Sequence, residues 1–203
     1  MSSKLYYKYA TMSSGKSGVL LMNAHQMEER NIPFLCLKSV LDTRDGDNVI
    51  ASRIGIKREC ISVETTDNLF DFINEYSANA WANGLAKPIW IFIDECQFLT
   101  AKQVNELARV VDELDINVVC YGLRGDFLSK SFEGSRRLFE LADEISEIKS
   151  SCSCGRKAII NARMTQDGNV VLDGEQIMIG GNDMYVPLCR KCFRQLIAKK
   201  HSK

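Results

Sequence analysis

Long apolar runs and a secretory signal are the first features that this 203-residue sequence lacks. No run approaches the roughly 18–20 apolar residues that a membrane-spanning helix needs. The first ten residues, MSSKLYYKYA, lack the apolar core and the small-residue cleavage site of a secretory signal. Internal repeats and low-complexity tracts are absent too, which excludes a repeat array. We therefore expect a globular cytoplasmic protein that makes no membrane contact.

Net charge is also absent, because 26 Lys and Arg balance 26 Asp and Glu, but the charges are unevenly distributed. Residues 1–149 carry 17 basic and 22 acidic residues, whereas residues 150–203 carry 9 and 4. The basic tail could contact phosphates or an acidic partner, or it could form a solvated face. Its glycines and short β-branched runs predict hairpins or a long loop. A chain of this length can hold one large domain and a small appendage, which we place at 1–149 and 150–203.

The most informative motif is ATMSSGKS, which lies between an apolar run, Leu5–Tyr9, and an amphipathic run, Ser17–Glu29. Strand, loop and then helix is the context of a phosphate-binding loop, in which Lys16 would reach the outer phosphates and Ser17 would hold Mg²⁺. The usual first glycine of GxxxxGK[ST] is replaced by alanine, so the alternative is a serine-rich turn with a surface lysine. The predicted nucleotide-binding residues of the loop are Ala10, Thr11, Met12, Ser13, Ser14, Gly15, Lys16 and Ser17.

A second motif is IWIFID at Ile89–Asp94, an apolar run of strand length that ends in two carboxylates. A carboxylate at the tip of a buried strand beside the P-loop strand would be a Walker-B residue, so Asp94 could meet the Mg²⁺ held by Ser17. Glu95 could take a proton from a nucleophile. The alternative is that the two carboxylates simply begin the next helix.

Apolar segments of strand length alternate with segments of helical period over the first 149 residues. This alternation predicts an α/β fold with a parallel sheet flanked by helices, in which ligands bind at the C-terminal edge of the strands. Ala10–Ser17, Asp94–Glu95 and Gly122–Phe127 would lie on that edge. Asp67 and Thr100 are candidate N-caps. The predicted strands are Lys4–Tyr9, Pro33–Lys38, Cys60–Glu64, Pro88–Asp94, Ile116–Gly122 and Glu144–Lys149, and the predicted helices are Ser17–Glu29, Asp67–Ala82, Thr100–Leu114 and Gly134–Ala142.

The eight cysteines form two groups. Four are isolated and are most simply buried hydrophobic residues: Cys36, Cys60, Cys96 and Cys120. The others form two close pairs, which in a reducing compartment predict a structural Zn²⁺ site with no open coordination position. A redox pair and unmetallated core cysteines are the alternatives. The predicted zinc ligands are Cys152, Cys154, Cys189 and Cys192.

Two further features have both a functional and an ordinary interpretation. The polar stretch Asp42–Gly55 could bring Arg44 and Arg53 near phosphates, but we favour an ordinary exposed connection. Several aromatic residues near the predicted edge and tail would individually be core residues, and together they would suit a nucleobase pocket. These aromatic residues are Phe98, Phe127, Phe132 and Tyr185.

Seven motifs, in order and over essentially the whole chain, resemble the thymidine kinases of the cellular, zinc-containing type, and they are nearest to bacterial members. The resemblance implies transfer of the ATP γ-phosphate to the 5′-hydroxyl of thymidine or deoxyuridine, a salvage step for DNA precursors. Bacterial members also tolerate a non-glycine at Ala10. The motifs are ATMSSGKS, DTR at Asp42–Arg44, SRIG at Ser52–Gly55, IDECQFL at Ile93–Leu99, YGLRGDF at Tyr121–Phe127, CSCGRKA at Cys152–Ala158 and GEQIMIGGNDMYVPLCRKC at Gly174–Cys192.

By the family pattern, Glu95 is the catalytic base, Asp94 joins Lys16 in handling Mg-ATP, and Gln97 lies beside the nucleotide. Gln176–Tyr185 resembles a lasso loop that covers thymine and whose ends the zinc holds. The resemblance also implies a homotetramer inhibited by dTTP. The implied nucleoside-binding residues are Met12, Phe98, Leu123, Phe127, Phe132, Gln176, Met178 and Tyr185.

Other functions stay open beside the resemblance. A P-loop alone fits an ATPase, a GTPase or a small-molecule kinase. A deoxynucleoside kinase of shifted specificity and an inactive paralogue are also compatible with the motifs. A P-loop core with a zinc ribbon could bind nucleic acid, although the acidic core and the lack of a long basic stripe lead us to expect no such partner. The basic residues that would make this contact are Arg156, Lys157, Arg190, Lys191 and Arg194.

Overall fold

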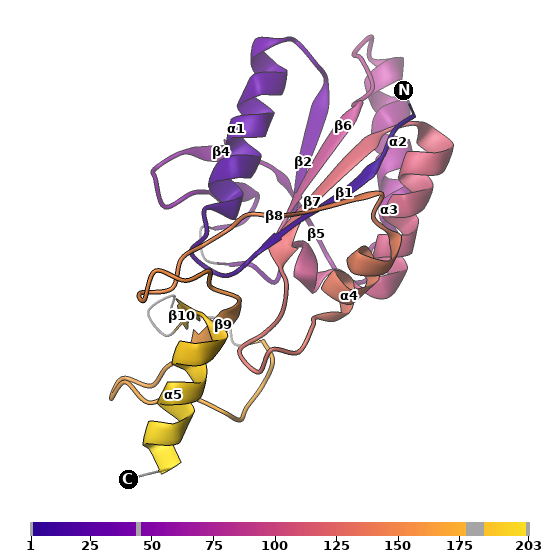
Figure 1. The fold of residues 1–203 in the computed structure, drawn as a ribbon. Helices are drawn as coiled ribbons and strands as arrows, with labels where there is room; N and C mark the ends of the chain where they lie inside the picture. Colours follow the sequence, from indigo (N-terminus) through magenta and orange to yellow (C-terminus); the bar gives the residue numbers. More distant parts are fainter. Residues whose placement is uncertain (1, 44–45, 178–184, 202–203) are drawn as a thin grey trace.

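A computed structural model describes residues 2–43, 46–177 and 185–201 of the protein (Figure 1). Its main sheet has six parallel strands in the order β5-β2-β6-β7-β1-β8, which confirms the predicted parallel α/β sheet. The strands of this sheet are β1 (Leu5–Ala10), β2 (Phe34–Ser39), β5 (Ile61–Val63), β6 (Trp90–Asp94), β7 (Asn117–Leu123) and β8 (Glu144–Glu147).

Helices cover both faces of this sheet, as Figure 1 shows. One face packs against α1 (Lys16–Glu29), and its core includes Leu20 and Phe92. The other face packs against three helices, which are α2 (Leu69–Ala82), α3 (Ala101–Leu114) and α4 (Glu133–Leu141). Because the central strands are buried on both sides, their sequences are continuous apolar runs. Every boundary of the strands and helices that we predicted lies within two residues of the observed one.

The two predicted helix caps have different outcomes. Thr100 caps α3 as expected, in a capping box: its hydroxyl accepts from the Gln103 N–H, and its own backbone N–H donates to Gln103 Oε1. Asp67 is not the cap of α2, because the Asn68 side chain accepts from the first N–H groups of that helix. The Asp67 carboxylate instead accepts from the Glu64 N–H at 2.7 Å. Asp67 and Asn68 both carry a side-chain oxygen that can accept from backbone N–H groups, so the predicted cap was wrong by one residue.

A second, smaller unit packs beside the C-terminal edge of the main sheet (Figure 1). It pairs β9 (Ile160–Arg163) antiparallel with β10 (Tyr185–Leu188) and ends in α5 (Arg190–His201). The expectation of hairpins or a loop in this tail missed α5, although Cys192 and Leu196 have helical spacing and pack into its core. The division at residues 149 and 150 stays a prediction.

A short strand lies in the stretch Asp42–Gly55, which we expected to be a plain connection, and a second short strand follows soon after it. They are β3 (Val49–Ala51) and β4 (Lys57–Glu59), which pair antiparallel as a hairpin. Among the described residues, no helix is both long and apolar enough to cross a membrane.

Candidate functional site

The loop between β1 and α1 presents several donors that a phosphate would bind. Ser13 (φ 56°) and Gly15 (φ 83°) are left-handed, and α1 begins at Lys16 with no side-chain cap on its first N–H groups. Lys16 is only 6% exposed, and its Nζ donates to the Thr11 carbonyl at 3.5 Å. The Ser14 hydroxyl is buried and has no hydrogen-bond partner in the part of the chain that the structure describes. The alternative of a surface lysine is therefore wrong, and the loop suits an anion.

Asp94 ends β6, but β6 is not the neighbour of the P-loop strand that we expected, because β7 lies between β6 and β1. Asp94 still reaches the start of α1, where Ser17 donates a hydrogen bond to it. The pKa of Asp94 is raised to about 7, chiefly by burial and secondly by repulsion from Glu95, against the lowering effects of Ser17 and Lys16. A buried carboxylate beside a hydroxyl offers the hard oxygen ligands that Mg²⁺ takes, so the residues present fit this ion.

The raised pKa of Asp94 predicts how stability changes with pH when no Mg²⁺ is present. The folded protein holds this proton more tightly than the unfolded chain, so the Asp94 contribution to the free energy of unfolding falls as pH rises from about 4 to 7. We expect Asp94→Asn to be more stable than the wild type by roughly 1–4 kcal/mol at pH 8 and by less at pH 5. Urea unfolding of both proteins at the two pH values measures this difference. A gain that is larger at pH 5 would contradict the assignment.

Glu95 follows with a left-handed backbone (φ 50°) and is 4% exposed. A short 3₁₀ helix, Cys96–Phe98, begins directly after it, so the alternative that the carboxylates start a helix is partly right. The Glu95 side chain, however, makes no cap hydrogen bond to that helix. Its Oε2 instead accepts from Gln97 Nε2 at 2.6 Å. The carboxylate is therefore oriented by a buried amide, as a general base needs.

Gln97 connects Glu95 to the end of the neighbouring strand. Its Oε1 accepts from the Leu123 N–H at 2.9 Å, and the side chain is buried. This approach requires Gly122, because a Cβ there would lie 2.5 Å from Cys96 Sγ and 2.8 Å from Gln97 Oε1. We predicted Gln97 as a nucleotide contact, and the structure gives it a supporting position behind Glu95.

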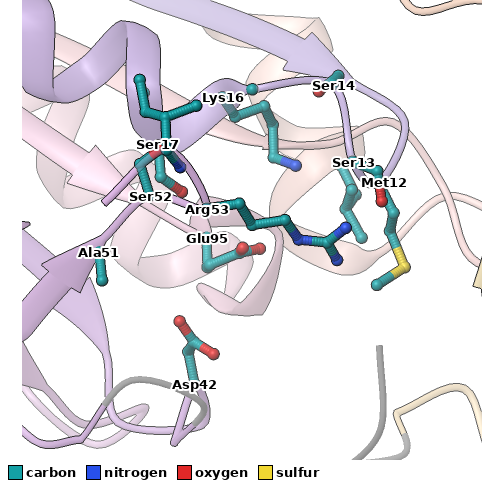
Figure 2. Close-up of a pocket in the computed structure, with 14 residues that line it drawn as sticks. Met12, Ser13, Ser14, Lys16, Ser17, Asp42, Ala51, Ser52, Arg53 and Glu95 are labelled. Carbon is teal, nitrogen blue, oxygen red and sulfur yellow. The ribbon is translucent and has the colours of Figure 1, made fainter. Parts of the chain in front are cut away.

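The phosphate-binding loop and Glu95 line one cavity of about 310 Å³. Figure 2 shows Lys16, Arg53 and Glu95 directing their charged ends into it. Of the predicted nucleoside contacts, Met12 and Leu123 belong to its lining. The full lining is Met12, Ser13, Ser14, Gly15, Lys16, Ser17, Gly18, Asp42, Ala51, Ser52, Arg53, Ile54, Glu95 and Leu123.

The hairpin of β3 and β4 supplies lining residues, of which the sequence analysis named Arg53 as the less favoured alternative and missed Ser52. We favoured an ordinary exposed connection for Asp42–Gly55, and this is wrong, because Asp42, Ser52 and Arg53 line the cavity. Gly18 makes the approach of the hairpin possible, since a Cβ there would lie 3.2 Å from Ser52 Oγ. Arg44 lies outside the described residues.

The four aromatic residues predicted for a nucleobase pocket fall into two pairs, one in direct ring contact and one joined by an arginine. Phe127 and Phe132 are buried, and Phe98 meets Phe132 edge to face at a centroid distance of 6.1 Å. The Arg163 guanidinium lies 3.8 Å from the Phe127 ring centroid, and its Nε donates to the Tyr185 hydroxyl at 2.8 Å. Phe127 and Tyr185 are thus brought together by a buried arginine that the sequence did not single out.

Two other predicted nucleoside contacts lie in the tail. Gln176 Nε2 donates to Asp126 Oδ2 at 2.9 Å, which places Gln176 against the segment after β7. Met178 lies outside the described residues, as does most of the predicted lasso loop.

The four paired cysteines gather at one point of the second unit. Their Sγ atoms all lie within 4.8 Å of one another, and Cys154 Sγ is 3.6 Å from Cys189 Sγ. Four Zn–S bonds of about 2.3 Å in a tetrahedron would separate the sulfurs by roughly 3.8 Å, so the four thiols fit Zn²⁺. Backbone hydrogen bonds from Cys154 and Cys189 lower the pKa of Cys152 to about 6, whereas hydrogen bonds with the other three thiols raise the pKa of Cys192 to about 12.

The isolated cysteines follow their prediction closely. All eight cysteines are free thiols. Cys36, Cys96 and Cys120 are buried, and Cys60 is half-buried.

The chain was compared with known proteins. The family model described as thymidine kinase matches residues 3–193. Thymidine kinases from Streptococcus agalactiae and from Lactococcus lactis subsp. lactis are both 47% identical over 93% of this chain and 95% of their own. Among solved structures, the genome packaging NTPase B204 from Sulfolobus turreted icosahedral virus 2 is 13% identical, with a TM-score of 0.43 over 75% of this chain and 78% of its own, which is too distant to add support. By its sequence, the chain belongs to the thymidine kinase family, in its bacterial form.

Proposed function

We propose that this protein transfers the γ-phosphate of ATP to the 5′-hydroxyl of thymidine, and of deoxyuridine, as a salvage step for DNA precursors. The observation that carries the proposal is that Lys16 of the phosphate-binding loop and the Glu95 carboxylate line the same cavity (Figure 2). Family membership, with relatives named thymidine kinase at 47% identity, supports thymidine as the acceptor.

In this proposal the triphosphate binds along Ala10–Ser17, where uncapped N–H groups at the start of α1 attract an anion. Lys16 neutralises the outer phosphates, and Arg53 adds a second cation from the hairpin tip. Ser17 and Asp94, which share a hydrogen bond, would hold Mg²⁺. The chemistry that Mg²⁺ supplies when bound is neutralisation of charge on the transferring phosphates.

Glu95 accepts the proton of the 5′-hydroxyl as the phosphoryl group arrives. The amide of Gln97 fixes which carboxylate oxygen faces the cavity, because it donates to Oε2 at 2.6 Å. The Leu123 N–H in turn donates to the Gln97 side chain, so the position of the Glu95 carboxylate is set before the substrate binds.

The nucleoside would lie between the P-loop and the segment after β7. Met12, Leu123 and Phe127 would contact it from the main unit, and Gln176 and Tyr185 from the tail. We further propose that the segment containing Met178 folds over thymine as a lasso, that residues 150–203 form the domain that holds it, and that Zn²⁺ on the four cysteines fixes its ends. Inhibition by dTTP, a homotetramer and a cytoplasmic location complete the proposal.

The proposal predicts ADP release that depends on the nucleoside. With Mg-ATP, thymidine and deoxyuridine should stimulate release, whereas purine deoxynucleosides should not, because a purine would leave polar groups of the pocket unpaired. The measurement is ADP release with each deoxynucleoside in turn, with Lys16→Ala as the background. Release that no nucleoside stimulates, together with salt-dependent binding to DNA or RNA, would instead favour nucleic-acid binding through the basic residues Arg156, Lys157, Arg190, Lys191 and Arg194.

A further inference from the structure

Asn161, in the second unit, is bonded to two loops of the main unit. Its Oδ1 accepts from the Met12 N–H at 2.7 Å, and its Nδ2 donates to the Gly125 carbonyl at 2.8 Å. The side chain is 3% exposed, so neither bond competes with bulk water. Both polar ends of one amide are therefore used to join segments that are 149 and 36 residues away in the chain.

The two loops carry opposite halves of the proposed reaction. Met12 belongs to the phosphate-binding loop, next to the left-handed Ser13. Gly125 lies between Leu123, which lines the cavity, and Phe127. The distance between donor phosphate and acceptor hydroxyl therefore depends on how these two loops are held relative to each other.

The loop after β7 is held stiffly enough to pass on a displacement. The Asp126 carboxylate accepts from the Leu128 N–H at 2.9 Å and from the Lys130 N–H at 2.8 Å, which fixes the turn after Gly125. A Cβ at Gly125 would lie 3.0 Å from the Lys130 carbonyl, so this backbone is closely packed. A change at the shared amide should therefore shift this loop as a whole relative to the phosphate-binding loop.

The strand that carries Asn161 is itself anchored on the same face. Two residues further along β9, the buried Arg163 lies over Phe127 and donates to the Tyr185 hydroxyl at 2.8 Å and to the Glu175 carbonyl at 3.0 Å. Alternate residues of a strand point to the same side, so β9 presents both polar side chains to the main unit.

We propose that Asn161 is a positioning residue for phosphoryl transfer: it sets the spacing between the phosphate-binding loop and the loop of the nucleoside site. This inference rests on the proposed function. Reacting atoms must be about 3–3.5 Å apart, and a misplacement of 1 Å can cost about 100-fold in rate. Removing the amide should therefore lower the rate of transfer more than it weakens the binding of either substrate.

The test uses the full-length protein with its metal. Asn161→Leu removes both hydrogen bonds, and we expect kcat to fall about 100-fold, with the dissociation constants of ATP and thymidine changed by less than about threefold. Asn161→Asp keeps an acceptor for the Met12 N–H and loses the donor to Gly125, so its kcat should lie between those of the wild type and Asn161→Leu. Asn169→Leu is the control for the same change of side chain elsewhere in the second unit: the bonds of Asn169 to Thr165 are made by its backbone, within one turn, and the variant should keep the wild-type kcat.

Several results would overturn the inference. They are an unchanged kcat in Asn161→Leu, a weaker binding of one substrate that accounts for the whole loss, or an equal loss in Asn169→Leu. If Asn161→Leu does not fold, a wild-type kcat in folded Asn161→Asp overturns it as well. A wild-type protein without thymidine-dependent ADP release would instead reject the proposed function, before any variant is compared.

Discussion

Glu95→Gln should lower kcat about 100- to 10,000-fold, which is the range that a positioned general base contributes. The substitution keeps the size of the side chain and removes its basicity. Its amide oxygen can still accept from Gln97 Nε2, the bond that now holds the carboxylate at 2.6 Å. Since Lys16 and the loop N–H groups are unchanged, the dissociation constant of ATP should stay within about threefold of the wild-type value.

The measurement combines steady-state kinetics with direct ATP binding. Glu106→Gln is a suitable control, because Glu106 is also a buried glutamate, 5% exposed, and supports the start of α2 by accepting from the Leu69 N–H at 2.9 Å. It should keep the wild-type kcat, because it does not line the cavity. Loss of ATP binding in Glu95→Gln, or a near-normal kcat, would reject Glu95 as the base.

The main sheet was predictable because its strands carry their own signal. β6 and β7 are buried on both faces, so their sequences are apolar runs of strand length that end at polar residues. The coincidence of the P-loop and Glu95 at one edge follows from parallel topology alone. The order of the strands did not follow, since nothing local in β6 says that β7 separates it from β1.

The supporting residues of the site were not predictable, because their roles depend on distant contacts. Gly122 matters only because Gln97 packs against it, and Ser52 lines the cavity only because a hairpin folds back over α1. Asn161 has no motif around it and is defined by two loops elsewhere in the chain. The residues proposed to bind phosphate or accept a proton were thus recognisable from short motifs, whereas the residues that support them were recognised only from the fold.

Removal of Zn²⁺ should unfold the second unit and abolish thymidine phosphorylation. The core of this unit is small, and its five buried members include Cys152 and Cys189 themselves. Structural zinc binds zinc-finger peptides with about 10–16 kcal/mol, a free energy that so small a core does not replace. Loss of the unit would also remove Asn161 and its bond to the phosphate-binding loop.

Cys192→Ser tests this without a chelator. We expect one zinc per chain in the wild type and much less in the variant, with a thermal transition of the second unit that is lowered or lost and kcat reduced at least 100-fold. Cys60→Ser is the control, because Cys60 is a half-buried thiol outside the cluster, and it should keep both zinc and activity. A wild-type protein that is folded and active without metal would reject the zinc site. A Cys192→Ser variant that loses zinc and keeps wild-type kcat would instead separate the metal from the geometry of the reaction.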